Sequence, residues 1–322
     1  MNYPIFDLHC DTAYALLSQE DWMVDKRLKS NKLHIDLDRA AKLPGYCQCF
    51  ACFTTPLEKL PPKMTVIDLF ERELNGILNE IGKNPDMIQQ AFSADDIRTN
   101  QEKGIMSAVL TIEGPAGFGF DPALLEMMHG VGFRISTLGW NEQNELIGSH
   151  KTGGGLTDLG REYVKECQRL GLLVDVSHCS DAGFWDIMDM TQAPVIASHS
   201  NSRGVWDTSR NLTDDMFKAI CRTGGVAGIN LYDGFLGDHA TLDTVCDHIF
   251  HFLEMDPEGE HIAFGGDLDG CESLPEGFAG VESYPDLVQR MLQRGIGEKI
   301  MQNICWNNAL GVMERAVRCH QK

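Results

Sequence analysis

The sequence predicts an α/β protein with the architecture of a closed (β/α)8 barrel, that is, a TIM barrel. Short apolar runs alternate with polar stretches of helical periodicity, which is the pattern of βα units around a parallel sheet. Eight such runs can be counted, and eight strands close a barrel of this type. The length of 322 residues fits one barrel with insertions, so residues 1–322 are expected to form a single catalytic domain.

The predicted strands are apolar runs of six to eight residues. They comprise residues 4–9, 46–53, 107–113, 132–138, 172–178, 194–199, 225–232 and 261–267. Helical periodicity between the runs predicts helices at residues 65–81, 158–170, 181–190, 214–222, 242–254 and 283–294. Residues 54–101 are longer than one crossover and are expected to carry extra helices. Residues 297–318 are expected to form a closing helical pair.

Composition excludes several classes of partner. The formal net charge of −20 argues against binding to nucleic acid or to anionic membranes. No signal peptide precedes the first strand and no apolar run reaches about 18 residues, so a cytoplasmic protein is expected. Eleven cysteines in such a chain are expected to be reduced. For Cys47, Cys49 and Cys52, burial in a strand is favoured over a metal or redox site.

Polar residues follow five of the apolar runs at the point where each strand is predicted to end. They are His9 with Asp11, Glu113, His178, His199 and Asp267. The carboxyl ends of barrel strands and the loops after them form one face, which carries the active site in enzymes of this fold. A random scatter of acids and histidines would not fall at the same end of five strands. The sequence therefore predicts a metal site at this face.

Taken alone, each of these residues has a plainer interpretation. His9 beside Asp11 is more often a core histidine next to a capping aspartate, and Glu113 could be a turn acid. His178 and His199 carry more weight, because each follows an apolar strand and their spacing of 21 residues matches one βα repeat. Imidazole and carboxylate groups without cysteine favour zinc, with manganese or cobalt as alternatives. A glutamate at this position can bridge two cations.

An ordered set of motifs gives a more specific indication. DLHCD, TIEG, VDVSH, PVIASHS, SRNLTDD and GGDLDG together resemble the renal (membrane) dipeptidase family, in its leaderless bacterial branch, over nearly the whole chain. The resemblance implies two zinc ions. His9 and Asp11 would bind the first ion, His178 and His199 would bind the second, and Glu113 would bridge both. A homodimer is also implied.

The resemblance further implies a reaction. A hydroxide shared by the two ions would attack the peptide bond of a dipeptide, and Asp267 would pass its proton to the leaving amine. Arg210, in the segment SRN, would pair with the free carboxylate of the substrate, and Tyr232 would line the pocket. Dipeptides with a C-terminal D-residue are among the implied substrates.

One segment departs from the family pattern. Vertebrate members have a histidine after the fourth strand that helps to polarise the substrate carbonyl. Here the segment reads STLGWNEQNE, and Trp140 stands at that place. Trp140 or Asn141 is therefore expected to shape the pocket instead, and the departure affects the substrate preference but not the metal ligands.

Two other classes of function remain as alternatives. The first is a barrel amidohydrolase with two metals that acts on another amide, such as a deaminase or a cyclic amidase. Those enzymes usually have the pattern HxH after the first strand, whereas this chain has HxD in His9 to Asp11. The second is a non-catalytic protein that has kept its metal site, against which the complete ligand set and Asp267 argue.

Overall fold

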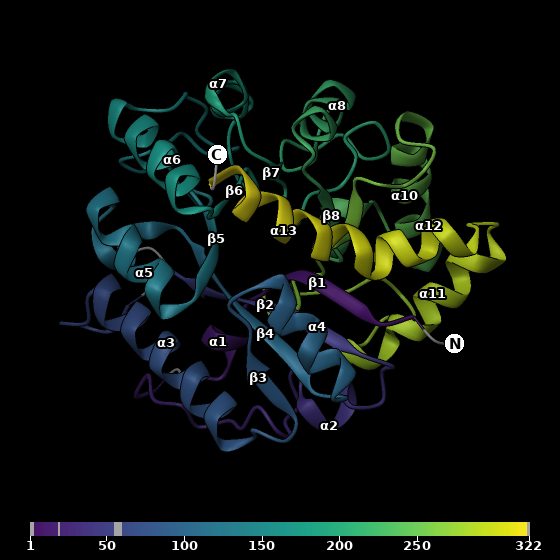
Figure 1. The fold of residues 1–322 in the computed structure, drawn as a ribbon, viewed down its shortest axis with the longest axis horizontal. Helices are drawn as coiled ribbons and strands as arrows, with labels where there is room; N and C mark the ends of the chain where they lie inside the picture. Colours follow the sequence, from purple (N-terminus) through teal and green to yellow (C-terminus); the bar gives the residue numbers. More distant parts are fainter. Residues whose placement is uncertain (1–2, 19, 55–59, 321–322) are drawn as a thin grey trace.

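Eight parallel strands form a barrel that is surrounded by helices (Figure 1). The computed structural model describes residues 3–18, 20–54 and 60–320. The predicted (β/α)8 barrel is confirmed. Its strands in chain order are β1 (Ile5–Cys10), β2 (Tyr46–Phe53), β4 (Met106–Glu113), β5 (Phe133–Thr137), β6 (Leu173–Asp175), β7 (Val195–Ile196), β8 (Ala227–Ile229) and β9 (Ile262–Phe264).

The strands pair in the order β7-β6-β5-β4-β2-β1-β9-β8. A parallel bridge between Ala197 and Ala227 joins the two ends of this order and closes the ring. A further strand, β3 (Ile88–Gln90), pairs with the first residues of β4. The sequence did not predict β3, because three residues reading IQQ are too short to show a period of two.

The helices lie close to their predicted positions. The predicted ends of α6 and α7 match the structure, and those of α3, α8, α10 and α11 differ by one or two residues. Residues 54–101 carry α3 and α4, as expected for extra helices, with β3 between them. The helices are α1 (Thr12–Ala15), α2 (Leu37–Ala40), α3 (Val66–Lys83), α4 (Ala94–Glu102), α5 (Leu125–Val131), α6 (Asp158–Leu170), α7 (Asp181–Met190), α8 (Asp214–Thr223), α9 (Asp233–Leu236), α10 (Leu242–Met255), α11 (Tyr284–Gln293), α12 (Glu298–Gln302) and α13 (Asn308–His320).

The last four barrel strands are shorter than predicted. They have two or three residues each, because the polar residues that follow them leave the hydrogen-bonded ladder. His178 and Asp267 have φ angles of 69° and 56°, in the left-handed region that non-glycine residues rarely adopt. Such conformations concentrate at functional sites, where surrounding contacts hold them in place.

The C-terminal helices close one end of the barrel. Helix α12 continues through a π-helical turn (Asn303–Asn307) into α13, which runs across the barrel in Figure 1. Phe6 and Leu8 of β1 pack in one core cluster with Trp306 and Leu310, and the rings of Phe6 and Trp306 are 5.7 Å apart. Burying each such side chain contributes about 1.5–3 kcal/mol. The tail thus covers the end of the barrel opposite to the strand carboxyl ends.

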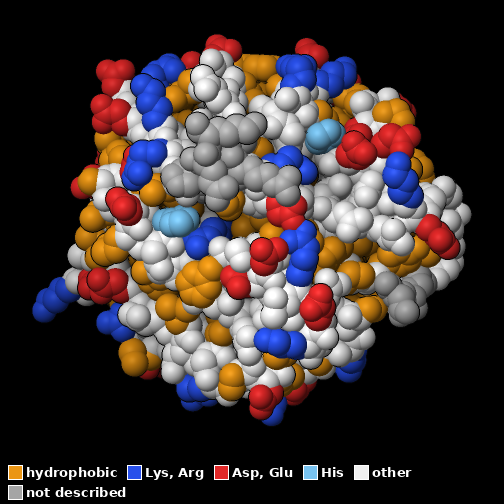
Figure 2. Space-filling view, in the orientation of Figure 1, with side chains coloured by type: hydrophobic (Ala, Val, Ile, Leu, Met, Phe, Trp, Pro, Cys, Tyr) orange, Lys and Arg blue, Asp and Glu red, His pale blue; other side chains and the backbone are white. Residues whose placement is uncertain are grey.

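The face of the molecule on which α13 lies carries both acidic and basic side chains. Figure 2 shows acidic and basic side chains interspersed with apolar ones over this face. Among the described helices, none combines the length and the apolar character needed to cross a bilayer.

Cys47, Cys49 and Cys52 of β2 do not form a joint site. Cys47 and Cys49 belong to the core cluster inside the barrel, whereas Cys52 packs in the cluster between strands and helices. Burial raises the pKa of all three thiols well above 9.0, so they stay protonated. The ten cysteines whose side chains are described are free thiols, as predicted.

Helix α3 carries a fully buried acid. The helix begins at Val66 after a capping box in which Thr65 and Asp68 bond each other's backbone N–H. Its buried face includes Glu73, whose Oε2 accepts a hydrogen bond from the Phe53 N–H at 2.6 Å. Within the described chain, Oε1 of Glu73 has no partner. Burial raises the pKa of Glu73 well above 4.5, and the nearby acids Asp11 and Glu113 add to the rise.

Replacing Glu73 with glutamine is expected to raise the free energy of unfolding, by an amount that grows with pH. The folded protein holds the Glu73 proton more tightly than the unfolded chain, so this carboxyl costs stability above its unfolded pKa. The cost grows by up to about 1.4 kcal/mol per pH unit until the folded-state pKa is passed. Urea unfolding of chelator-treated wild type and variant between about pH 5 and 8 measures the difference in their free energies of unfolding. A difference that does not grow with pH would contradict the expectation.

Candidate metal centre

The carboxyl ends of five strands bring the predicted ligands together. His9 lies in β1, where the pairing with β2 shifts register between Asp7 and Cys10, and Glu113 is the last residue of β4. His178, His199 and Asp267 each follow the end of their strand by three residues. The five predicted ligands are at most 9% exposed. Asp267 lies in the wall of a cavity beside them.

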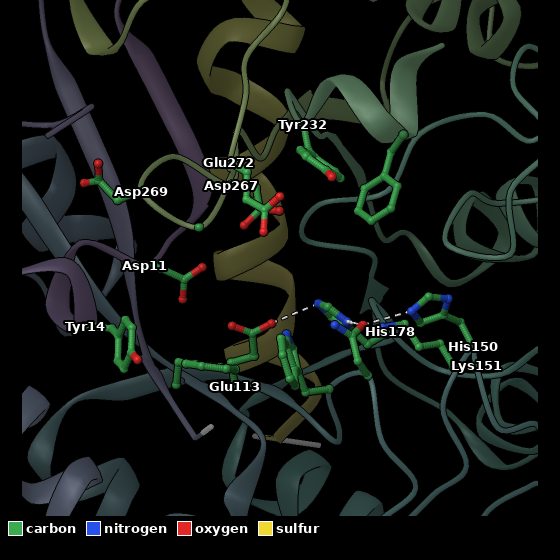
Figure 3. A pocket seen from close by; sticks show the side chains of 15 residues that line it. Asp11, Tyr14, Glu113, His150, Lys151, His178, Tyr232, Asp267, Asp269 and Glu272 are labelled. Carbon is green, nitrogen blue, oxygen red and sulfur yellow. Dashed lines mark hydrogen bonds and ion pairs between the residues drawn. The ribbon is translucent and has the colours of Figure 1, made fainter. Parts of the chain in front are cut away.

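Glu113 lies at the centre of the cluster. Its Oε2 is 3.4 Å from Nε2 of His9, and its Oε1 is 2.9 Å from Nε2 of His178 and 3.9 Å from Nε2 of His199. Figure 3 shows Asp11 and Glu113 facing a common space, with His178 on the other side of the glutamate. Each carboxylate oxygen therefore faces a different histidine group, which is the geometry that a bridging ligand needs.

The tautomers of His178 and His199 follow from their second hydrogen bonds. The Ser198 hydroxyl donates to Asp175 Oδ2 at 2.5 Å, so its oxygen accepts from Nδ1 of His199 at 2.6 Å. Nδ1 of His178 lies 3.2 Å from the amide oxygen of Asn141, which can only accept. Both imidazoles thus carry their proton on Nδ1 and present an unprotonated Nε2 to the cluster.

This arrangement places electron-rich atoms face to face. The Nε2 atoms of His178 and His199 are 3.0 Å apart, and neither carries a proton in these tautomers. In the described part of the chain, His9 Nε2 and Asp11 Oδ1 are buried without a hydrogen-bond partner. Buried polar atoms without partners are costly, and cations would satisfy them. The residues therefore fit a site for divalent metal.

Two sets of ligand atoms are compact enough to hold an ion. Atoms of His9, Glu113 and His199 all lie within 4.8 Å of one another, and so do atoms of His9, Asp11 and Asp267. The second set includes Asp267, for which the sequence predicted a role in proton transfer. Both sets share His9, and Glu113 connects them to His178.

Gly270 makes room for this cluster. A Cβ atom at this position would lie 2.1 Å from Asp11 Oδ2 and 2.6 Å from Asp267 Oδ1. Both distances are far inside van der Waals contact, so a side chain at position 270 would displace the two acids. The loop after β9 therefore requires glycine beside the site.

Burial determines the ionisation of the cluster. It raises the pKa of Glu113 to about 7 and that of Asp267 to about 6, and the charge of Asp11 adds to both. Burial also lowers the pKa values of His178 and His199 well below 6.5, which keeps both imidazoles neutral. Burial opposes the charge of His9 as well, but Glu113 and Asp11 raise its pKa well above 6.5. A metal ion bound at His9 would displace that proton.

A cavity of about 510 Å³ opens onto the cluster. The predicted pocket residues Trp140, Asn141 and Tyr232 all line it. The Trp140 ring packs edge-on against Phe53 with centroids 4.9 Å apart, and Tyr232 packs edge-on against Phe235 at 4.8 Å. Aromatic side chains thus flank the metal-binding groups and leave space for a small organic substrate.

Arg210 lies beside this cavity but does not line it. It is 3% exposed and donates to Ser200 Oγ at 3.1 Å, and its guanidinium carbon is 5.2 Å from the ring centre of Phe235. Among the described residues, no carboxylate lies within 4.0 Å of it, and its Nε has no partner. A buried guanidinium without an anion retains its capacity to pair with a carboxylate.

Three residues of the site were missed by sequence reasoning. Asp175 holds Ser198 and so fixes His199, and its signal was an acid inside the apolar run LLVDVSH. Asn230 donates to Asp267 Oδ2 at 3.0 Å. His150 lines the cavity and follows no strand, so no pattern pointed to it.

Comparison with known proteins identifies the family. The sequence model of the membrane dipeptidase family (peptidase family M19) matches residues 1–322. An uncharacterized dipeptidase of Schizosaccharomyces pombe is 35% identical over 64% of this chain, and the match spans only 52% of that protein. An uncharacterized protein in the pqqA 5′ region of Klebsiella pneumoniae is 30% identical over 77% of this chain and 96% of its own length.

A solved structure agrees in fold. A metallo peptidase from Rhodobacter sphaeroides, liganded with a phosphinate mimic of the dipeptide L-Ala-D-Ala, superposes with a TM-score of 0.87. It is 26% identical, and the match covers 98% of this chain and 100% of that one. The resemblance to the membrane dipeptidase family that the ordered motifs predicted is confirmed. This chain belongs to the membrane dipeptidase family, peptidase family M19.

Proposed function

We propose that this protein is a two-zinc dipeptidase whose substrates include dipeptides with a C-terminal D-residue. The observation that carries the proposal is the position of Glu113, with one carboxylate oxygen facing His9 and the other facing His178 and His199. The phosphinate mimic of L-Ala-D-Ala bound to the Rhodobacter sphaeroides relative supports the substrate class.

The chain supplies a complete set of ligands for two ions. His9 and Asp11 would hold one ion, His178 and His199 would hold the other, and Glu113 would bridge them. Two zinc ions in such a site would activate a water molecule and polarise the scissile carbonyl. Nitrogen and oxygen ligands without cysteine suit zinc.

Other residues would orient the substrate and move protons. Asp267, held by the Asn230 amide, would take a proton from the attacking water and deliver it to the leaving nitrogen. Arg210 would pair with the free carboxylate of the dipeptide, since within the described chain it has no anion of its own. Trp140, Asn141 and Tyr232 would contact the rest of the substrate.

Purified protein is expected to contain about two zinc ions per chain and to cleave L-Ala-D-Ala in a chelator-sensitive manner. Elemental analysis measures the metal, and an amine assay with L-Ala-D-Ala and L-Ala-L-Ala measures cleavage and stereochemical preference. Activity should fall by at least about a hundredfold in chelator and return when zinc is added back.

Other outcomes would separate the alternatives. Bound metal without cleavage of any dipeptide would favour a different amide substrate, and Trp140 would be the first residue to examine. Protein that does not bind metal even after zinc is added would contradict the proposal. The predicted homodimer and cytoplasmic location remain predictions from the sequence.

A further inference from the structure

Asn141 connects two histidines through one oxygen atom. It lies four residues beyond the end of β5 and lines the cavity. Its Oδ1 is 3.2 Å from Nδ1 of His178 and 2.9 Å from Nε2 of His150. An amide oxygen has two lone pairs, so it can accept one N–H from each imidazole.

The neighbours of Asn141 are compatible with this orientation. With its Nε2–H directed at Asn141, the neutral His150 must accept at Nδ1, which lies 2.9 Å from Ser209 Oγ. The backbone N–H of His150 donates to the His178 carbonyl at 2.8 Å. The Ser149 hydroxyl donates to the Asn141 carbonyl at 2.7 Å. Backbone and side chain of Asn141 are therefore both held.

The amide nitrogen of Asn141 is left over. Among the described residues, none accepts a hydrogen bond from its Nδ2. Asn141 is half-buried, and its Nδ2 is not among the fully buried atoms that lack a partner. This nitrogen is therefore accessible to a bound molecule. Because Asn141 lines the cavity beside His178, this NH2 group offers two donors to a bound molecule.

We propose that Asn141 acts in two directions, as a positioning residue for His178 and as the hydrogen-bond donor to the carbonyl oxygen of the scissile bond. The proposal rests on the proposed dipeptidase function. The amide oxygen holds His178 with its Nε2 toward Glu113, while the NH2 group stabilises the negative charge that develops on the substrate oxygen.

Its neighbours in the cavity wall are less suited to this second task. Both ring nitrogens of His150 are engaged, by Asn141 and Ser209, so the imidazole has no N–H left for substrate. Lys151 is exposed to solvent. An amide that is already fixed by two imidazoles needs no reorganisation during the reaction, which is the property of an effective oxyanion donor.

Two variants separate the two roles. Asn141→Asp keeps an oxygen that accepts from both histidines but removes the N–H donors, and Asn141→Ala removes both without adding charge. Chelator competition is expected to show zinc affinity within about threefold of wild type for Asn141→Asp and about 10- to 100-fold weaker for Asn141→Ala. At saturating zinc, kcat of both should fall about 100-fold with KM changed by less than about threefold.

The matched control is Gln143→Ala, which alters an exposed residue of the same loop and should match wild type in both assays. Asn141→Ala with wild-type zinc affinity would overturn the positioning role. Asn141→Ala with wild-type kcat at saturating zinc would overturn the donor role. A wild-type protein that binds zinc but cleaves no dipeptide would instead contradict the proposed function and the donor role with it, while the zinc affinities still decide the positioning role.

Discussion

Glu113→Gln is expected to abolish binding of both metal ions and to lower kcat/KM by at least about a thousandfold. The glutamate faces His9 with one oxygen and His178 with the other, and among the described residues it is the acid that lies within 4.0 Å of both. In the glutamine variant, an NH2 group would replace one of the two carboxylate oxygens. A cation on that side of residue 113 would then face a hydrogen-bond donor and would lose an anionic ligand. Elemental analysis and steady-state kinetics on the purified variant measure the two effects.

Glu73→Gln is the matched control for this change. It makes the same substitution at another fully buried glutamate, whose Oε2 accepts from the Phe53 N–H and which, among the described residues, forms no hydrogen bond with the candidate metal ligands. We expect the control to keep both metals and wild-type kinetics. If Glu113→Gln retained two ions per chain and turned over dipeptides normally, Glu113 would not be the bridge and the site would need another arrangement.

Residue type and position in the sequence both indicated the same candidate ligands. A histidine or acid directly after an apolar strand lies at the catalytic face of a barrel, whatever the loops do. His9, Glu113 and His199 are expected in one cluster on this ground, and candidate ligand atoms of the three lie within 4.8 Å of one another. Register and strand length were not required for that conclusion.

Hydrogen-bond partners of the ligands could not be predicted in the same way. Ser209 meets His150 across 59 residues, and neither lies in a strand or helix, so no periodicity marks the contact. The role of Asn230 could not be predicted either, because an asparagine near the end of a strand is also common in an ordinary turn. The position of Arg210 beside the cavity wall likewise depends on how the loop after β7 folds against Phe235.

The short strands show a related limit. The predicted strand lengths followed the length of each apolar run. The hydrogen-bonded ladder between strands instead stops where the backbone turns to place a side chain in the site. His178 at φ 69° and Asp267 at φ 56° are two such points. β6 and β9 therefore end earlier than predicted because the backbone turns there to place side chains in the site.

Asp267→Asn is expected to lower kcat by about 10²- to 10⁴-fold while both metal ions stay bound. Asparagine keeps the size of the side chain and can still bond the Asn230 amide, but it cannot accept a proton from water or deliver one to the leaving nitrogen. The measurement must include metal content, because an Asp267 oxygen lies 3.8 Å from His9 Nε2 and within reach of a cation held by His9 and Asp11. Loss of one ion in the variant would make Asp267 a ligand and leave proton transfer to another group. Retained metal with unchanged kcat would exclude both roles.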